Sequence, residues 1–326
     1  MKIFPRLGRR KGAALLLTLL VVGLLSASVI AFMKAAHLEI LVAENIYAFT
    51  QAEILAQAGL KGAMTSLAMD DADVDSLNDS WARFQDYAAL AGGLFEEGGF
   101  TGSIEDLSGK FNLNLLIDQK GPVNQQGLVD EAREGICRRL FEQLGVDDQL
   151  LPNILDWLDP DDLPRSGGTE NYYYSSLNPP YPCGDGPLDV LGQFLKIKGA
   201  TAKLLRGGED APGLDRFLTV HTNGKININT APKEILIALD QDMTETAAQE
   251  IIDLRTAEPF EKIDLLKEVA GVTPEIFNRV TAGLVAVNST CFQIRIEGVF
   301  REARAPLTAV VKRSDRGVEL IYYRAG

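Results

Sequence analysis

The chain has 326 residues, a formal net charge of −13 and a hydrophobic content of 46%. This length exceeds what one hydrophobic core usually holds, so we expect at least two packed units. The acidic balance repels the phosphates of nucleic acids, and no nucleic acid partner is expected on this ground. The two histidines, His37 and His221, accompany no serine triad, zinc pattern or phosphate loop, so catalysis is not expected.

The first predicted element is a membrane-spanning helix. Residues 13–33 carry no charge, and as a helix rising ~1.5 Å per residue they reach about 31 Å, the thickness of a hydrocarbon core. A secretory signal peptide has a shorter apolar region, of about 7 to 15 residues. Residues 1–12 hold five basic residues and no acid. The positive-inside rule therefore keeps them in the cytoplasm and places the rest outside.

The same helix is predicted to continue as a stalk through residues 34–69, which contain no proline. Ile40, Tyr47 and Ile54 recur every seven residues and form an apolar stripe. Either the whole stripe packs on the head of the protein, or its upper half does so while its lower half packs on neighbouring stalks. Four aspartates then end the helix in a loop expected to be solvated: Asp70, Asp71, Asp73 and Asp75.

Two short stretches farther along the chain resemble each other. Residues 108–114 read SGKFNLN and residues 223–229 read NGKININ, and each stretch precedes a mostly helical region. Helices are predicted around 131–145 and 150–158 after the first stretch. After the second, Thr230 is expected to cap a helix that begins at Pro232. The middle of the chain is therefore predicted to form two related helical lobes, at about 109–215 and 216–288.

Strands are predicted at the end of the chain. The segment CFQIRIEGVF alternates apolar and polar residues, as a half-buried strand does, and a hairpin is expected to turn at Ser314 to Gly317. Together with a strand near Phe100 to Leu107, these form a small antiparallel sheet on the upper stalk helix. The fold class is thus α+β, with a head at 70–108 and 289–326 and a helical insertion at 109–288.

Carboxylates gather where the helix predicted over 150–158 ends. The helix dipole disfavours anions at this end, so a cation is expected among them. Their spacing resembles a calcium loop, although Pro164 stands where an EF-hand needs glycine. A solvated acidic loop balanced by Arg165 is the alternative. The gathered acids are Asp156, Asp159, Asp161 and Asp162. The predicted metal ligands are Asp159, Asp161 and Glu170, with Asp185 and Asp189 as weaker candidates.

The three cysteines, Cys137, Cys183 and Cys291, match no metal-ligand spacing. One disulfide is allowed in an oxidising compartment, and the sequence leaves its pairing open.

The junction Lys11-Gly12-Ala13, followed by an unbroken apolar helix, resembles the class III leader of type IV pilins and pseudopilins. That resemblance implies cleavage after Gly12 by a prepilin peptidase, methylation, and retention of the apolar helix. Leu17 is the fifth residue after the cut, where most members of this family carry a glutamate. The K class of type II secretion pseudopilins, general secretion pathway protein K, typically lacks that acid.

Residues 156–181, within the first predicted lobe, are similar to the K class as well. They hold an Asp-Trp-x-Asp helix end, a Gly-x-Glu, tyrosines and a Pro-Pro-Tyr loop. The matching residues are Asp156, Trp157, Asp159, Gly168, Glu170, Pro179, Pro180 and Tyr181. The resemblance covers almost the whole chain. It implies a pseudopilin fold, in which a long membrane-spanning helix packs on a small antiparallel sheet with a large helical insertion, and calcium bound in that insertion.

The function implied by the resemblance is that of a minor pseudopilin at the tip of the type II secretion pseudopilus, which starts and caps the filament that exports folded proteins. The implied location is the inner membrane, with a single span and a periplasmic domain. The implied partners are minor pseudopilins of the I and J classes, a prepilin peptidase, the inner-membrane secretion machinery and exported proteins.

Two other functions stay open at this point. A minor pilin of a type IV pilus is the nearest variant. A membrane-anchored DNA-binding protein is the other, because ININTAPKEIL and IIDLRTAEPFEKIDLLKEVAGV resemble the helix-hairpin-helix modules of competence DNA receptors. Residues 258–275 hold two lysines and five acids, which disfavours binding to phosphates.

Overall fold

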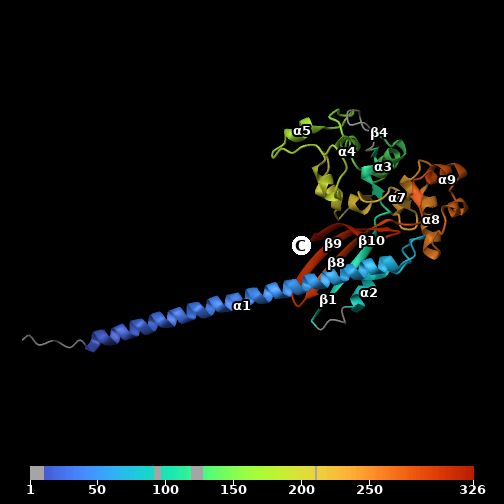
Figure 1. Cartoon of the computed structure of the whole chain (residues 1–326). Coiled ribbons are helices and arrows are strands. Elements are labelled where there is room, and N and C mark those ends of the chain that lie inside the picture. Colours follow the sequence, from blue (N-terminus) through green and yellow to red (C-terminus); the bar gives the residue numbers. More distant parts are fainter. Residues whose placement is uncertain (1–10, 92–96, 119–127, 210) are drawn as a thin grey trace, which may run out of the picture.

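The structure is a computed structural model that describes residues 11–91, 97–118, 128–209 and 211–326. Its first element, helix α1 (Lys11–Met69), joins the predicted membrane span and stalk in one unbroken helix (Figure 1). From Gly12 onward, α1 is long and apolar enough to cross a membrane. The leader predicted over residues 1–12 lies outside the described residues, apart from Lys11 and Gly12.

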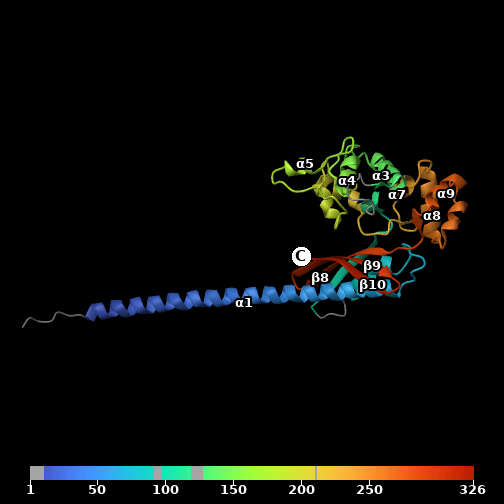
Figure 2. The ribbon, with the colours of Figure 1, turned by 45° about the horizontal axis from the view of Figure 1, so that its top comes forward.

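A four-stranded antiparallel sheet forms the head. Its strands stand in the order β1 (Gly98–Asp106), β8 (Cys291–Phe300), β9 (Ala303–Ser314) and β10 (Gly317–Ala325). Strands β1 and β8 pair from Gly98 opposite Phe300 to Asp106 opposite Phe292. A 3-10 helix, η1 (Trp81–Arg83), and helix α2 (Phe84–Ala91) lie beside β1. The predicted antiparallel sheet on the stalk helix is confirmed, and the sheet lies between α1 and the insertion (Figures 1 and 2).

Helix α1 packs on the sheet mainly through small residues. A Cβ on Gly298 of β8 would lie 2.0 Å from the carbonyl oxygen of Ala52, and one on Gly59 would lie 2.7 Å from the Phe100 ring. Both positions therefore require glycine. The core between helix and sheet contains Ala56, Leu60, Ala63, Leu67, Phe292, Ile294, Ile296, Leu307, Ala309 and Val311.

The expectation that the upper part of the seven-residue stripe packs on the head is wrong for Ile54 and holds only for a ring contact of Tyr47. The side chain of Ile54 is 52% exposed, and Tyr47, also exposed, meets Phe300 in an edge-on ring contact at 5.8 Å. Large side chains at these positions would hold α1 away from the strands, whereas alanine and glycine allow the close approach that the sheet requires.

The insertion leaves the sheet after β1 and rejoins it at β8. The first lobe contains β2 (Phe111–Asn112), η3 (Leu113–Leu115), β3 (Ile117–Asp118), β4 (Leu128–Val129), α3 (Glu131–Gln143), α4 (Leu150–Leu158), α5 (Asn171–Ser175), η4 (Leu191–Lys196), α6 (Ala202–Arg206), η5 (Leu214–Arg216) and β5 (Leu218–Thr219). The second contains β6 (Ile226–Asn227), α7 (Lys233–Ala238), α8 (Glu245–Ala257), η6 (Ile263–Glu268), α9 (Pro274–Thr281) and β7 (Val285–Ala286). One continuous hydrophobic core runs through both lobes.

The two lobes repeat one local structure, as the paired SGKFNLN and NGKININ stretches predicted. In the first lobe, the Asn114 side chain accepts a hydrogen bond from the Leu188 N–H (2.7 Å) and donates to the Leu188 carbonyl (2.9 Å). In the second, Asn229 makes the same two bonds with Phe260, at 2.9 and 3.0 Å. Strand β2 pairs in parallel with β5, and β6 pairs in parallel with β7.

Each lobe then continues with a 3-10 helix, a left-handed glycine and a short helix. The glycines are Gly199 (φ 88°) and Gly271 (φ 90°), and both need the conformational freedom that a Cβ would remove. Two residues later Thr201 and Thr273 cap α6 and α9 with their side-chain oxygens. The lobes are therefore related in backbone structure as well as in sequence.

The loop after α1 is solvated only in part, because Asp71 and Asp73 are exposed as predicted whereas Asp75 is fully buried. Its carboxylate forms an ion pair with Arg313 of β9 and accepts a hydrogen bond from the Ser289 N–H (2.7 Å). A buried carboxylate is tolerated only with such partners. The loop is thereby fixed to the sheet.

Asp106, at the end of β1, connects the sheet with the insertion. It accepts hydrogen bonds from the Ser108 N–H (2.7 Å) and from the hydroxyls of Ser289 (2.6 Å) and Thr230 (2.5 Å). The prediction that Thr230 caps a helix is therefore wrong, because its hydroxyl bonds to Asp106 instead. Helix α7 starts one residue later than predicted, with Pro232 at its N-cap.

The three cysteines are buried and free, so the disulfide that the composition allowed is not formed. Burial raises the pKa of each thiol above its usual range, which keeps the sulfur atoms protonated and unreactive.

Candidate metal centre in the helical insertion

Helix α4 brings two carboxylates to one buried place. All of its residues except Pro152 are buried. Asp156 and Asp159 are three positions apart and so share a helix face, and neither side chain is exposed to solvent. Asp159 is the C-cap of α4, and its N–H bonds to the Leu155 carbonyl at 3.0 Å. The carbonyls of this helix end add partial negative charge to the same place.

The loop that follows α4 folds back and adds a third carboxylate, Glu170. Its side chain belongs to a residue that is only 5% exposed, and neither carboxylate oxygen has a hydrogen-bond partner among the described residues. Gly168 permits the close approach, because a Cβ there would lie 1.9 Å from Oδ2 of Asp156. One oxygen atom each of Asp156, Asp159 and Glu170 lie within 4.8 Å of one another.

Arg165 compensates part of this negative charge. Its guanidinium contacts Asp156 (3.0 Å) and Asp159, and its backbone N–H donates to the Asp156 carboxylate at 3.2 Å. This is the balancing role that the alternative prediction gave to Arg165. Glu170 has no ion-pair partner among the described residues, so one buried acid is left uncompensated.

The pKa values reflect this imbalance. Burial, and after it the charges of Asp156 and Asp159, raise the pKa of Glu170 to about 8. Burial raises the pKa of Asp159 to about 6, although its contact with Arg165 acts in the opposite direction. The ionised form of both groups therefore costs free energy, which a bound cation would offset.

The other predicted ligands lie at different distances from this centre. Asp161 accepts a hydrogen bond from the Leu163 N–H through one oxygen (2.7 Å), and its other oxygen is buried without a hydrogen-bond partner among the described residues. Asp185 forms a second group with Glu170 and Cys183, again within 4.8 Å. Asp189 belongs to neither group, and its carboxylate accepts a hydrogen bond from Gln193 (3.1 Å).

Asp156 was not among the predicted ligands, although it stands at the centre of the site. The signal that could have found it is its spacing of three residues from Asp159 on a buried helix face. Cys183 was considered only as a disulfide partner. It lies next to the site, and its thiol contacts the Asp156 carbonyl at 3.9 Å.

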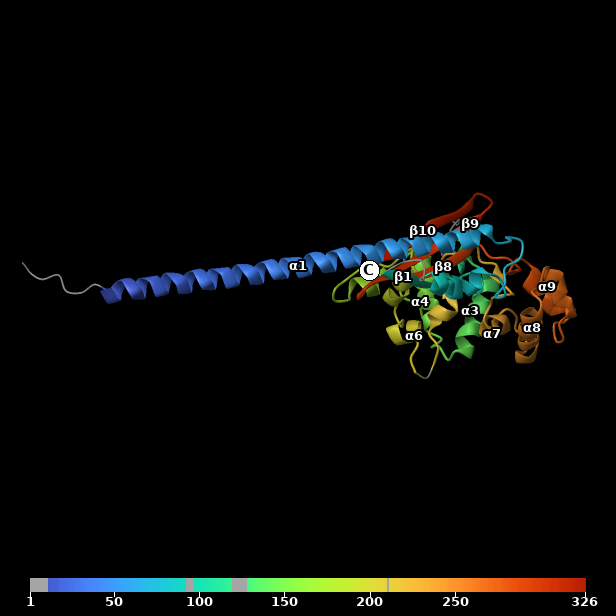
Figure 3. The same cartoon turned by 90° about the horizontal axis from the view of Figure 1, so that it is seen from below.

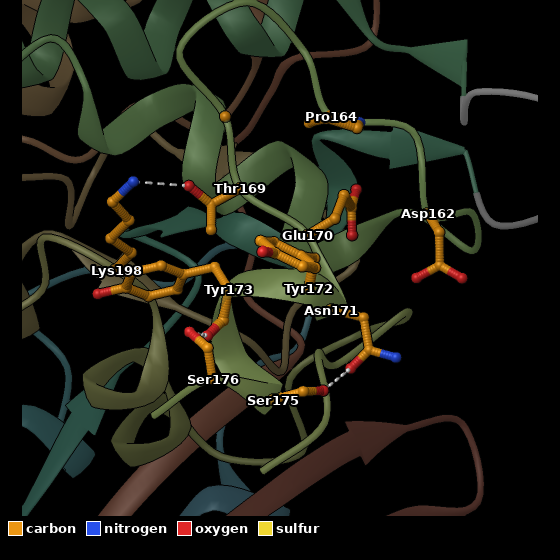
Figure 4. A pocket seen from close by; sticks show the side chains of 11 residues that line it. Asp162, Pro164, Thr169, Glu170, Asn171, Tyr172, Tyr173, Ser175, Ser176 and Lys198 are labelled. Carbon is orange, nitrogen blue, oxygen red and sulfur yellow. Dashed lines mark hydrogen bonds between the residues drawn. The ribbon is translucent and has the colours of Figure 1, made fainter. Parts of the chain in front are cut away.

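An open cavity of about 790 Å³ leads to Glu170 from the solvent. Figure 4 shows the Glu170 carboxylate on the side of the cavity that faces Asp162, with Lys198 across from it. Lys198 donates a hydrogen bond to the Thr169 hydroxyl at 3.0 Å, and its ammonium lies 4.7 Å from the centre of the Tyr173 ring. Of the three clustered acidic residues, Glu170 is the one that lines this cavity.

The donor atoms fit a hard divalent cation. Calcium binds about 6 to 8 oxygen atoms, from carboxylates, carbonyls and water. The three clustered carboxylates and the half-buried Asp161 supply such oxygens, and several of them lack another partner. Asp156, Asp159 and Glu170 would hold the ion, with Asp161 and Asp185 at its edge.

A long apolar N-terminal helix packed on a small antiparallel sheet, with a helical insertion between the first strand and the other three, is a pseudopilin fold. Among solved structures, the chain is similar to one titled as the GspK-GspI-GspJ complex of the type 2 secretion system from enterotoxigenic Escherichia coli. The TM-score is 0.64 and the identity 17%, over 90% of this chain and 99% of that one. This likeness supports the fold.

The sequence comparisons identify the family. Models described as type II secretion system protein K match residues 109–207 and 226–287. The type II secretion system protein K of Aeromonas hydrophila is 28% identical over 95% of both chains. The putative protein K of Escherichia coli strain K12 is 26% identical over 60% of this chain and 59% of its own length. The chain belongs to the type II secretion system protein K family and is thus a minor pseudopilin of type II secretion.

Proposed function

We propose that this minor pseudopilin stands at the tip of the type II secretion pseudopilus, where it starts and caps the filament that drives folded proteins across the outer membrane. The role is structural and not catalytic. The observation that carries the proposal is the position of the second lobe. Its helices α8 and α9 extend past the C-terminal end of α1 (Figures 1 and 3). In a filament whose subunits stack along their N-terminal helices, a further subunit would need that space.

The surface of α1 supports assembly below this lobe. Large apolar side chains remain exposed along α1 well beyond the predicted membrane span, among them Ile40, Ile46, Phe49 and Ile54. Such a surface is expected to be covered by a partner. We assign this role to minor pseudopilins of the I and J classes, because the similar solved structure is titled as a complex of those proteins.

The amino-terminus agrees with a first-in-line subunit. In this proposal a prepilin peptidase cuts after Gly12, the new terminus at Ala13 is methylated, and α1 stays in the inner membrane with the head in the periplasm. A carboxylate inside the membrane is costly unless it pairs. A subunit with no other ahead of it needs no such pair, and Leu17 stands at that position.

Co-purification tests the tip assignment. The full chain, expressed with I- and J-class minor pseudopilins and extracted in detergent, should elute with both as one stable complex. Salt-dependent capture of DNA fragments without such a complex would contradict the proposal and favour the DNA-binding alternative. The mass of the amino-terminal peptide, from cells with and without the peptidase, tests the processing step. A chain that keeps residues 1–12 in both strains would contradict it.

We further propose that the centre at Asp156, Asp159 and Glu170 binds calcium. The two unpartnered oxygens of buried Glu170 carry this proposal. Millimolar calcium should raise the melting temperature of the chelator-treated protein, and magnesium should do so less, because it demands a smaller and more regular oxygen cage. No shift with calcium would contradict the assignment.

A further inference from the structure

A cleft of about 250 Å³ separates the first lobe from the sheet face that points away from α1. Figures 1 and 2 show the first lobe and α1 on opposite sides of the sheet. The wall on the lobe side comes from the segments around η4, α6 and β5. The wall on the sheet side consists of Gln293, Arg295, Thr308, Val310, Tyr322 and Arg324.

Apolar and basic side chains line the cleft together. The apolar ones include Leu191, Leu218 and Val220 of the lobe and Val310 and Tyr322 of the sheet. Four basic side chains line the cleft against one aspartate, in a chain whose net charge is −13. A basic lining in an acidic protein points to a ligand that carries negative charge.

Two of the four basic residues are already neutralised. Lys110 and Arg295 both contact Glu105, at 2.5 and 2.8 Å. Lys110 also donates a hydrogen bond to the Asp215 carbonyl at 2.8 Å. These two residues therefore stabilise the junction between sheet and lobe.

The other two basic residues of the cleft have no partner among the described residues. Arg206 ends α6 on the lobe side, and Arg324 lies on β10 on the sheet side. Both are exposed, and neither makes an ion pair or side-chain hydrogen bond within the described part of the chain. A carboxylate is the natural guest for such a guanidinium, because two parallel N–H donors match its two oxygens.

We propose that this cleft binds an extended acidic segment of another protein, with its carboxylates on Arg206 and Arg324 and its apolar side chains in the groove. An extended peptide places alternate side chains on opposite faces. A sequence in which acidic and apolar residues alternate therefore presents one kind to the arginines and the other to the apolar walls.

Other anions fit the cleft less well. Lipid headgroups are too far away, because Tyr47, which contacts Phe300 of the sheet, stands 14 positions after Met33 on α1, and at ~1.5 Å per residue this distance is about 21 Å. Nucleic acid would meet the acidic field of the whole chain. A peptide with a few carboxylates avoids that repulsion and also uses the apolar walls.

The test uses the full chain in detergent and a short fluorescein-labelled peptide in which glutamate alternates with valine. Fluorescence anisotropy should report saturable binding that weakens with salt. The same peptide with glutamine in place of glutamate should lose at least about tenfold in affinity. Arg324→Glu and Arg206→Glu should each weaken binding about tenfold. Arg316→Glu is the matched control, because Arg316 is exposed on the turn after β9, outside the cleft, and should leave binding unchanged.

A second variant tests the groove without changing charge. Gly192 lines the cleft, and a Cβ there meets no atom within 4 Å, so Gly192→Trp should fill the groove and abolish binding while the protein stays folded. Gly62→Trp, at an equally open position on α1, is its control. The proposal is overturned if the acidic peptide does not bind, if Arg316→Glu weakens binding as much as Arg324→Glu does, or if an oligothymidine binds as tightly. None of these measurements needs the secretion machinery, so their failure leaves the tip assignment standing.

Discussion

The buried carboxylate of Glu170 should make the stability of the calcium-free protein depend on pH. Its pKa is about 8 in the folded protein, against the ordinary glutamate value of 4.5 in the unfolded chain. Between these two values the folded protein holds a proton that the unfolded chain does not. Because the native state then binds more protons, the free energy of unfolding falls as pH rises from about 5 to about 8.

The size of the effect follows from the same two pKa values. Going from pH 5 to pH 7 in a chelator should cost about 2 kcal/mol of stability from Glu170 alone. For a unit as large as the insertion this corresponds to a melting temperature lower by about 4 to 8 °C. Asp159, with a pKa of about 6, adds a smaller share in the same direction.

The assay is thermal unfolding of the full chain in detergent at several pH values, with a chelator and with saturating calcium. Calcium should flatten the pH dependence, because it binds the ionised carboxylates. Glu170→Gln should reduce the pH dependence and abolish most of the calcium response, whereas Glu131→Gln, on the exposed first turn of α3, should change neither. If Glu170→Gln keeps the full pH dependence, Glu170 is not the titrating group and the reasoning fails.

Three further predictions concern the packing. Gly298→Ala places a Cβ 2.0 Å from the Ala52 carbonyl and should lower the free energy of unfolding by about 3 kcal/mol or more, whereas Gly62→Ala on the open side of α1 should be neutral or stabilising in the same urea titration. Asn229→Ala leaves the Phe260 N–H and carbonyl without their side-chain partner and should lower the free energy of unfolding by about 2 to 3 kcal/mol. A loss smaller than that of an exposed Asn→Ala change would show that these bonds do not stabilise the lobe. Ile46→Asp, at a 62% exposed position, should leave the melting temperature unchanged and release the I- and J-class partners during co-purification, and retention of both would place the interface elsewhere.

The sheet could be predicted from the sequence because each strand carries its own pattern. In β8, Phe292, Ile294 and Ile296 are buried while Arg295 between them is exposed, and this alternation is visible in one stretch of chain. The face of α1 that meets the sheet could not be predicted in this way. It is chosen by the close approach of the strands at Gly298, which belongs to a segment more than two hundred residues away.

The burial of Asp75 could not be predicted from the sequence either. Asp75 belongs to a run of aspartates that reads as a solvated loop, and its burial depends on Arg313 and Ser289 near the other end of the chain. No pattern in the neighbouring sequence indicates such a distant partner. The relation between the lobes could be predicted, because the same stretch occurs in both, with Asn114 and Asn229 at equivalent positions after similar turns.

The candidate metal centre lies between these two cases. Asp159 could be named from the sequence because acids at a helix end demand a cation, and Glu170 because it stands twelfth in a calcium-loop spacing that begins at Asp159. The contribution of Asp156 depends on how closely Gly168 lets the loop approach. The distant Asp189 was included because its side-chain bond to Gln193 is invisible to spacing. The sequence therefore locates the acidic segment that contains the candidate ligands, but it does not distinguish these ligands from the other acidic residues nearby.

The segment between α4 and η4 explains why an ion would matter to this fold. Over residues 159–190 the only regular element is the five-residue helix α5, so few backbone hydrogen bonds hold the segment in place. Its inner side is anchored by aromatic contacts of Trp157 with Tyr174 (5.1 Å) and of Tyr174 with Tyr181 (5.6 Å), while its other side ends in mutually repelling carboxylates. A cation at Glu170 would close that side, and closing a long loop brings a large gain in stability. Calcium removal should therefore raise amide hydrogen exchange within this segment, and leave exchange in the sheet unchanged.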